Sequence, residues 1–365
     1  MSGKTLSLIG GALVAAALAF FVAQNRAPST QVVAQAQLFV GLSEGINDVD
    51  RVTVTGAGNE VKVTLVRGEA AWTVAQRGGY RADPAKVRKL LIDLADAQLI
   101  ERKTARPENY AVLGVEDVSA QTATGVQIAL GGLGAEQAVI LGNSARNNAA
   151  MYVRRSAEAV SWVANARLRF DQTPAAWLVK DLIDINTSRM QRMRIEHADG
   201  EVVDVARAGV NFEVLNAPDG KTLADSTTAN ETAGVINNLK FEDVVAAGQF
   251  DAGDAPSTKI EFRTSDGLVV DATATAANGK YYLSLTTRPE QLTPADFASA
   301  EAPAAGEPTP AEKVIAMFSA MQAQSADINQ RVDGWVFSIP LFKYEQLTRR
   351  MDAMLGQQQE TMGPE

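Results

Sequence analysis

Residues 51–68 read RVTVTGAGNEVKVTLVRG, and this stretch predicts the fold of the chain. Apolar and polar side chains alternate on both sides of a glycine-containing turn at residues 56–58. Alternation with a period of two is typical of strands that bury one face, and glycine suits the turn that joins them. We therefore expect a β-hairpin whose buried face consists of Val52, Val54, Val61, Val63 and Leu65.

The same pattern returns at residues 192–209, RMRIEHADGEVVDVARAG, which align with the first stretch without a gap. In each copy further strands follow, and a tryptophan with a valine after it closes the series, at Trp162 and Trp335. Repetition of a whole series of elements is typical of duplicated modules. We therefore expect two tandem modules, at residues 46–187 and 188–355.

Helical patterns interrupt the strands of each module. Asp83 is a suitable N-cap and Pro84 a suitable first helical residue, and apolar side chains then recur at helical spacing. We expect further helices at residues 173–183 and 227–246. The predicted fold class is α+β: an N-terminal transmembrane helix, then two tandem-duplicated modules of mostly antiparallel sheet with packed helices.

The N-terminus carries an uncharged apolar run over residues 6–23, preceded by Lys4. Its eighteen residues would form roughly 27 Å of helix, close to the ~30 Å hydrocarbon core of a bilayer. Signal peptides usually have a shorter apolar part and a cleavage motif directly behind it. We expect an uncleaved transmembrane anchor at residues 1–26, a polar tether at 27–45 and a polar tail at 356–365. By the positive-inside rule the N-terminus is cytoplasmic.

The composition limits the classes of function. The chain has 365 residues, 46% of them hydrophobic and 21% charged, which is typical of globular domains. A formal net charge of −9 disfavours nucleic acid as a partner, because binding to a phosphate backbone needs clustered Lys and Arg. Cysteine is absent, which removes disulfides, thiolate metal sites and cysteine nucleophiles.

No pattern of catalytic or metal-binding residues is visible in the sequence. His197 is the single histidine, and we expect it to be an exposed residue of a hairpin turn. The glycine-rich residues 131–136, GGLGAE, lack a phosphate-binding motif and are expected to form another turn. Adjacent carboxylates point in different directions, so we expect solvated surface rather than an acid–base pair at Glu116 with Asp117 and at Glu242 with Asp243. We predict no catalytic, cofactor-binding or metal-binding residues, and a hydrolase is the least favoured hypothesis.

The second module contains an insertion at about residues 288–330 that the first module lacks. It reads as an Ala/Pro-rich loop followed by an amphipathic helix with several methionines. Because Met adapts to irregular surfaces, this helix either fills a gap between the modules or docks a partner helix. The candidate docking residues are Val314, Met317, Phe318 and Met321.

Five short motifs resemble a known family: W-T-V at 72–74, D-P-x-x-V-x-x-L-L at 83–91, L-G at 141–142, Y-V-R at 152–154 and G-W-V-F-x-I-P at 334–340. They are similar to the bacterial family called domain of unknown function 4340. The sequence Leu113-Gly114-Val115 departs from the Tyr-Gly-Leu type of turn that is more usual there. The resemblance implies an envelope protein associated with ABC-type transport systems of the gliding-motility auxiliary kind, and it implies no catalytic residues.

We therefore expect a single-pass inner-membrane protein whose bulk is periplasmic and which is not an enzyme. Its expected role is that of an accessory protein that binds envelope or ABC transporter subunits, with no cofactor. The alternative is an extracytoplasmic module that binds a lipid, glycan or peptide in a cleft between the two modules. That alternative requires a sizeable pocket between the modules, lined by apolar side chains and a few polar ones.

Overall fold

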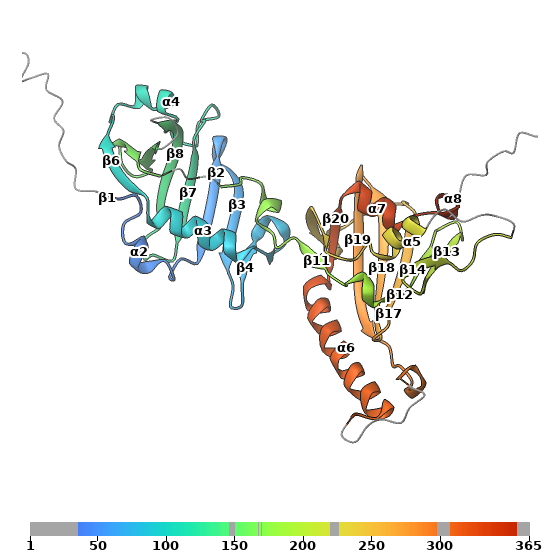
Figure 1. Cartoon of the computed structure of the whole chain (residues 1–365). Helices are drawn as coiled ribbons and strands as arrows, with labels where there is room; N and C mark the ends of the chain where they lie inside the picture. The colour runs from blue at the N-terminus through green and yellow to red at the C-terminus, as the bar shows by residue number, and fades with distance from the viewer. Residues whose placement is uncertain are drawn as a thin grey trace, which may run out of the picture.

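The computed structural model describes residues 36–145, 150–166, 168, 170–219, 226–297 and 307–355. This part of the chain has an α+β fold with two antiparallel sheets that follow one another along the sequence (Figure 1). The expected anchor, most of the tether and the tail lie outside the described residues. Within the described ranges, no helix combines the length and the apolar character needed to cross a membrane.

The first domain is built on a ten-stranded sheet in which all paired strands are antiparallel. Helix α3 (Pro84–Ala95) covers one face and buries Val87, Leu90, Leu91 and Leu94 in the core. The Asp83 side chain accepts hydrogen bonds from two backbone N–H groups of its first turn, as expected for an N-cap. The strands, in their order across the sheet, are β1 (Ala36–Gln37), β6 (Gln98–Arg102), β10 (Ser161–Ala164), β9 (Ala150–Arg155), β8 (Gln137–Ala145), β7 (Val126–Gly131), β2 (Arg51–Gly56), β3 (Glu60–Arg67), β4 (Trp72–Val74) and β5 (Tyr80–Arg81).

The second domain is built on an eight-stranded antiparallel sheet, with helices α5 (Ser226–Ala233) and α7 (Leu341–Leu347) packed on it and the short α8 (Met351–Met354) near the end of the chain (Figure 1). The strands, in their order across the sheet, are β14 (Asn211–Val214), β13 (Val202–Ala208), β12 (Met190–Glu196), β17 (Ser257–Thr264), β18 (Leu268–Ala277), β19 (Lys280–Pro289), β20 (Trp335–Ile339) and β16 (Asp243–Ala246). Both hairpins that the sequence predicted, β2 with β3 and β12 with β13, are confirmed. Val61, expected on the buried face of the first hairpin, is instead 49% exposed, because the strand register shifts between Val54 and Thr55 and ends the regular alternation there.

The strands of the two sheets follow the same order. The second sheet reads β14-β13-β12-β17-β18-β19-β20-β16, and the first contains the series β4-β3-β2-β7-β8-β9-β10-β6. Each member of one series therefore corresponds to the member ten places earlier in the numbering. The first sheet has two additional short strands, β1 and β5, one at each edge.

Three sequence-based expectations differ from the structure. Residues 36–45, expected in the tether, belong to the first domain: they form β1 and helix α2 (Leu42–Gly45), and Leu38, Phe39 and Leu42 are buried in the core. Burial of these apolar side chains is more favourable in free energy than the conformational freedom that the segment would keep as an exposed tether.

The helices expected at residues 173–183 and 227–246 are much shorter than predicted. The first is a 3-10 helix, η4 (Pro174–Trp177), followed by strand β11 (Asp181–Ile183), which pairs with β15 (Leu239–Lys240). The second ends at Ala233, because Gly234 and the left-handed backbone of Asn238 interrupt the helical pattern. In both segments tertiary pairing of strands overrides the local apolar periodicity.

The two domains meet at a cluster of aromatic rings, which we call the aromatic seam: Tyr80, Phe241, Trp335 and Phe337. Tyr80 belongs to β5 of the first domain, and its ring lies at 5.0 Å from the Trp335 ring and 5.6 Å from the Phe241 ring, edge to face in both cases. Such edge-to-face pairs are favourable beyond the area they bury. Burial raises the pKa of the Tyr80 hydroxyl, which Arg81 and Arg331 partly oppose.

An ion pair next to the aromatic seam also joins the domains. Arg77 is the last residue of the 3-10 helix η2 (Ala75–Arg77) of the first domain, and its guanidinium donates to both carboxylate oxygens of Asp243 on β16, at 2.5 and 2.8 Å. Both side chains are about three-quarters enclosed, with 25% and 26% of their surface exposed. This bidentate geometry fixes the orientation of the second domain relative to the first.

The long helix α6 (Pro310–Val332) lies within the expected insertion and extends away from the sheet in Figure 1. It begins with a capping box between Thr309 and Glu312. Near its C-terminus the Asn329 side-chain amide accepts from the Thr287 N–H and donates to the Thr287 carbonyl, both at 2.8 Å. Because β20 pairs only with Tyr281–Leu283 of β19, this amide takes the place of a neighbouring strand further along β19.

Candidate functional site: a polar groove on the second sheet

The outer face of the second sheet is open and polar. Its strands alternate, so that Ile260 and Phe262 of β17 are buried in the core while Lys259 and Glu261 point to the opposite face. Together with neighbouring strands, this face forms a groove with a volume of about 670 Å³. We call it the sheet groove.

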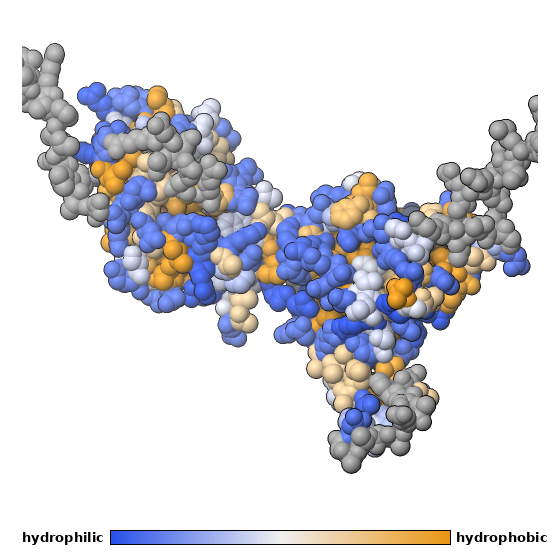
Figure 2. All heavy atoms as spheres, viewed as in Figure 1, coloured by the Kyte–Doolittle hydropathy of each residue, from blue (hydrophilic) through white to orange (hydrophobic). Residues whose placement is uncertain are grey.

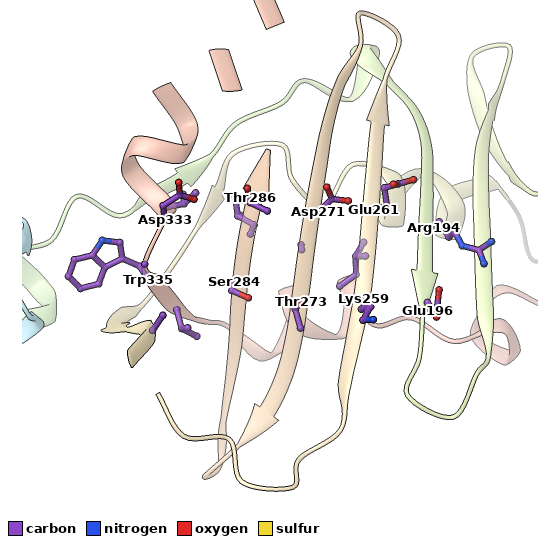
Figure 3. Close-up of a pocket in the computed structure, with 17 residues that line it drawn as sticks. Arg194, Glu196, Lys259, Glu261, Asp271, Thr273, Ser284, Thr286, Asp333 and Trp335 are labelled. Atoms are coloured by element: carbon purple, nitrogen blue, oxygen red, sulfur yellow. The ribbon is translucent and has the colours of Figure 1, made fainter. Parts of the chain in front are cut away.

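Two rows of side chains cross the sheet groove, perpendicular to the strands (Figure 3). The strand register places Glu196, Lys259, Thr273 and Ser284 opposite one another in the first row. The second row, two residues along each strand, is Arg194, Glu261, Asp271 and Thr286. Asp333 and Trp335 border the groove beyond β19, on the side that faces the first domain.

The second row and its surroundings form a network of ion pairs. Glu261 accepts from Arg263 at 2.7 Å and from Arg288 at 3.0 Å, and Arg288 also donates to Asp271 at 2.9 Å. The hydrogen bond that Arg263 donates to Glu261 raises the pKa of the Arg263 guanidinium, and the one it donates to Glu290 acts in the same direction. The carboxylates here are thus occupied as acceptors, which is an arrangement for holding charge in place rather than for transferring protons.

The first row contains two charges that no residue in the described part of the chain matches with an ion pair. Lys259 and Glu196 are cross-strand neighbours, but their charged groups do not form an ion pair in the described part of the chain. Lys259 makes no other ion pair with a described residue. A groove that exposes one cation and one anion side by side can take a partner that supplies the opposite charges in the same register.

The corresponding face of the first sheet is covered. The segment with η3 (Pro107–Asn109) and α4 (Tyr110–Leu113) crosses it and packs Tyr110 and Val115 against Ile140. Arg154, 4% exposed, holds this segment: it donates to the Val115 carbonyl at 2.8 Å and to Asp117 at 2.6 Å, and its guanidinium lies 4.7 Å from the Tyr110 ring. In the second domain the segment between β16 and β17 forms only the short η6 (Ala247–Gln249), which leaves the sheet groove open.

The candidate docking residues on α6 are only partly available to a partner. Val314 and Met321 are 7% exposed, and the Arg189 guanidinium lies 3.5 Å from the Met321 sulfur. Met317 and Phe318 are half-buried. Met321 belongs to the main core. Docking of a partner helix on this face stays a prediction.

His197 is buried, not exposed as the sequence predicted. It is 6% exposed, its Nδ1 lies 3.3 Å from the Thr258 hydroxyl, and its Nε2 has no partner in the structure. The turn that carries it is held by the C-terminal segment, because Arg350 forms ion pairs with Asp199 and Glu201. A sequence pattern could not show this, since the two segments lie about 150 residues apart.

In each of the two carboxylate pairs, which were expected to be solvated surface, one member is bound to an arginine. Asp117 binds Arg154, and Asp243 binds Arg77 of the other domain. Among the residues that the structure describes, there is no group of three or more His, Asp or Glu side chains placed to hold a metal ion.

The residues of the sheet groove were not singled out from the sequence. In the sequence they appear only as charged residues that alternate with apolar ones along a strand, as Lys259 and Glu261 do in STKIEFRT at residues 257–264. The same alternation occurs on any half-buried strand, and only the absence of a covering segment makes this face a groove.

Comparison with known proteins gives one match. No curated protein and no solved structure matches the chain significantly. Residues 72–261 match a family with the description "domain of unknown function", and this range includes strands of both sheets and the aromatic residues Tyr80 and Phe241. The match covers just over half of the chain, so the protein belongs to the domain of unknown function family DUF4340.

Proposed function

We propose that this protein is a non-catalytic, membrane-anchored accessory protein of the bacterial envelope, an auxiliary component of an ABC-type transport system. It acts by binding another protein subunit through the sheet groove. The observation that carries this proposal is the difference between the two outer faces: the first is closed by its own α4 segment, and among the described residues the second is uncovered, with Lys259 and Glu196 in no ion pair.

The proposed anchor is the apolar run at residues 6–23, with Lys4 on the cytoplasmic side and the two domains in the periplasm. An anchor keeps the domains at the membrane plane, where the effective concentration of any membrane-bound partner is high. The proposal predicts that the full-length protein stays with the membrane fraction in alkaline carbonate. Release of the intact chain into the soluble fraction would contradict the anchor.

The proposed partner is a protein because the sheet groove is wide and open and carries side chains of both charges. It offers rows of side chains from four strands and a tryptophan at its border, as protein interfaces do, but no enclosed apolar pocket for a small molecule. The bidentate Arg77–Asp243 contact and the aromatic seam support this role, because they hold the groove at a fixed orientation to the first domain.

The proposed interface can be tested by reversing one charge. We expect Lys259→Glu to abolish co-purification of the transporter permease from membranes after crosslinking, since it places two carboxylates opposite each other at Glu196. The matched control is Arg102→Glu, an equal change of charge on an exposed residue of β6 in the first domain. Equal recovery of the permease with both variants would contradict the role of the groove.

We also propose that the two domains arose by tandem duplication. Three observations support this: the shared order of eight strands, the aligned hairpins at residues 51–68 and 192–209, and the Trp-Val pair within strands β10 and β20. An experimental structure in which β2 to β4 and β6 to β10 did not superimpose on their counterparts would refute the duplication.

A ligand-binding role is the second candidate, and one feature favours it. A hollow of about 410 Å³ lies where the Arg77 turn meets β16, beside the paired rings of Phe250 and Tyr282, whose centroids are 4.7 Å apart. Its lining is mainly polar, so a glycan or peptide suits it better than a lipid. Thermal-shift measurements with short saccharides and peptides test this role, and Tyr282→Ala should remove any shift that depends on the hollow.

A further inference from the structure

A second groove lies on the first domain, apart from the sheet groove to which the proposed protein partner binds, and it combines arginine and apolar side chains. It lies between α3 and the strands β3 and β4 and has a volume of about 340 Å³. We call it the arginine groove. Its walls are two guanidinium groups and a set of apolar side chains, Arg67, Arg88, Trp72, Leu91, Ile92 and Ile46, and none of its lining residues is acidic.

Arg67 has a guanidinium whose Nε and Nη2 lack an acceptor among the described residues. Its Nη1 donates to the Asn47 carbonyl at 2.5 Å, and its Cζ lies over the Trp72 ring, 5.0 Å from the centroid. The Nε–H is enclosed with no partner in the described structure. The Nε–Nη2 edge of an arginine is the edge that binds carboxylate or phosphate oxygens in pairs, so this side chain is oriented and incompletely satisfied.

Arg88 adds a second free cation. It is exposed on α3, and within the described residues it makes neither a hydrogen bond nor an ion pair. The nearest acid along the same helix, Asp93, is already paired with Lys89 at 2.7 Å. In a chain with a net charge of −9, two unpaired arginines at one groove without a lining carboxylate point to an anionic ligand.

The apolar part of the groove limits the kind of anion. Ile92 is exposed on α3 next to the half-buried Trp72 and Ile46, and Figure 2 shows hydrophobic atoms on the face of the first domain where Figure 1 places α2 and α3. A free inorganic anion gains nothing from such surface. An amphiphile places its charged group on the arginines and its hydrocarbon on the apolar wall.

We propose that the arginine groove binds the headgroup of an anionic phospholipid, with the phosphodiester on Arg67 and Arg88 and the first part of an acyl chain on Trp72 and Ile92. The source of the lipid rests on the membrane anchor proposed above. Twelve residues, 24–35, separate the apolar run from β1, and they can span at most about 40 Å, which keeps the first domain close to the bilayer surface.

The test is calorimetric titration of the full-length protein in a non-ionic detergent with three probes. These are short-chain phosphatidylglycerol, phosphatidylcholine with the same chains, and inorganic phosphate. We expect phosphatidylglycerol to bind, and the pair of changes Arg67→Gln and Arg88→Gln to weaken its binding roughly 30-fold, at about one kcal/mol for each basic group. Arg88→Gln alone, at an exposed position without partners, gives part of this loss with no risk to folding.

The control variant is Arg102→Gln, an exposed arginine of the same domain, which we expect to bind phosphatidylglycerol as the native protein does. Three results would overturn the inference: equal binding of both lipids, inorganic phosphate binding as tightly as the lipid, or no loss in the double variant. Membrane fractionation of the same variants separates the two proposals. Absence of phosphatidylglycerol binding by a native protein that stays with the membrane refutes the arginine groove alone, and phosphatidylglycerol binding by a native protein found in the soluble fraction refutes the anchor alone.

Discussion

The bidentate contact between Arg77 and Asp243 should couple the stability of the two domains. Replacing Arg77 with alanine removes both hydrogen bonds and leaves the Asp243 carboxylate three-quarters enclosed without its cation. Hydrogen bonds to charged groups contribute roughly 1.5–3 kcal/mol, and a fully buried pair costs more when broken. Because a quarter of each side chain is hydrated, we expect a loss of about 2 kcal/mol in the free energy of unfolding.

The assay is denaturant unfolding of the full-length protein, carried out as a double-mutant cycle with Arg77→Ala, Asp243→Asn and both together. We expect a coupling energy of about 1–2 kcal/mol, because the two changes remove the same contact. The control is the exposed pair of Lys89 and Asp93 on α3, for which we expect only about 0.3–0.5 kcal/mol. A coupling energy at Arg77 and Asp243 no larger than that of the control would refute the reasoning.

Three further changes test other parts of the fold. Asn329→Ala should cost about 1–2 kcal/mol, because it leaves the Thr287 N–H without its acceptor and the Thr287 carbonyl with only the Ser325 hydroxyl as a donor, and hydrogen exchange at Thr287 should become faster. Arg154→Ala should cost about 3 kcal/mol and make the α4 segment sensitive to protease, since a buried guanidinium with three acceptors is lost; native sensitivity would contradict its role. The raised pKa of Tyr80 stabilises the folded state below pH ~10 and loses that contribution as pH rises further, so the difference in stability between Tyr80→Phe and the native protein should change with pH only above ~10.

Much of the fold follows from local pattern. The hairpins at 51–68 and 192–209 form because alternation leaves one face apolar, and α3 begins at Asp83 and Pro84 because both suit the first turn. The helix expected at 173–183 fails for a tertiary reason: the segment is needed to bridge the domains, where Leu178 pairs with Ala82 and β11 pairs with β15. The local spacing of apolar residues does not predict such pairing between distant segments.

The candidate sites were harder to predict than the fold. The sheet groove exists because the segment between β16 and β17 is short and forms only η6. In the first domain the segment between β6 and β7 is longer, and it folds back so that Tyr110 packs on the sheet. The arginine groove depends on Arg67 and Arg88 meeting across 21 positions of the chain. Each residue alone looks like ordinary hydrated surface in the sequence.

The side-chain amide of Asn329 gives the insertion a second significance. Strand β19 is longer than the strand β20 beside it, so part of its backbone would present free N–H and carbonyl groups to another molecule. Helix α6 blocks that stretch at Thr287. Deletion of the insertion would therefore leave an exposed edge strand with unpaired backbone groups, and the truncated chain should precipitate or assemble into fibres through edge-to-edge pairing.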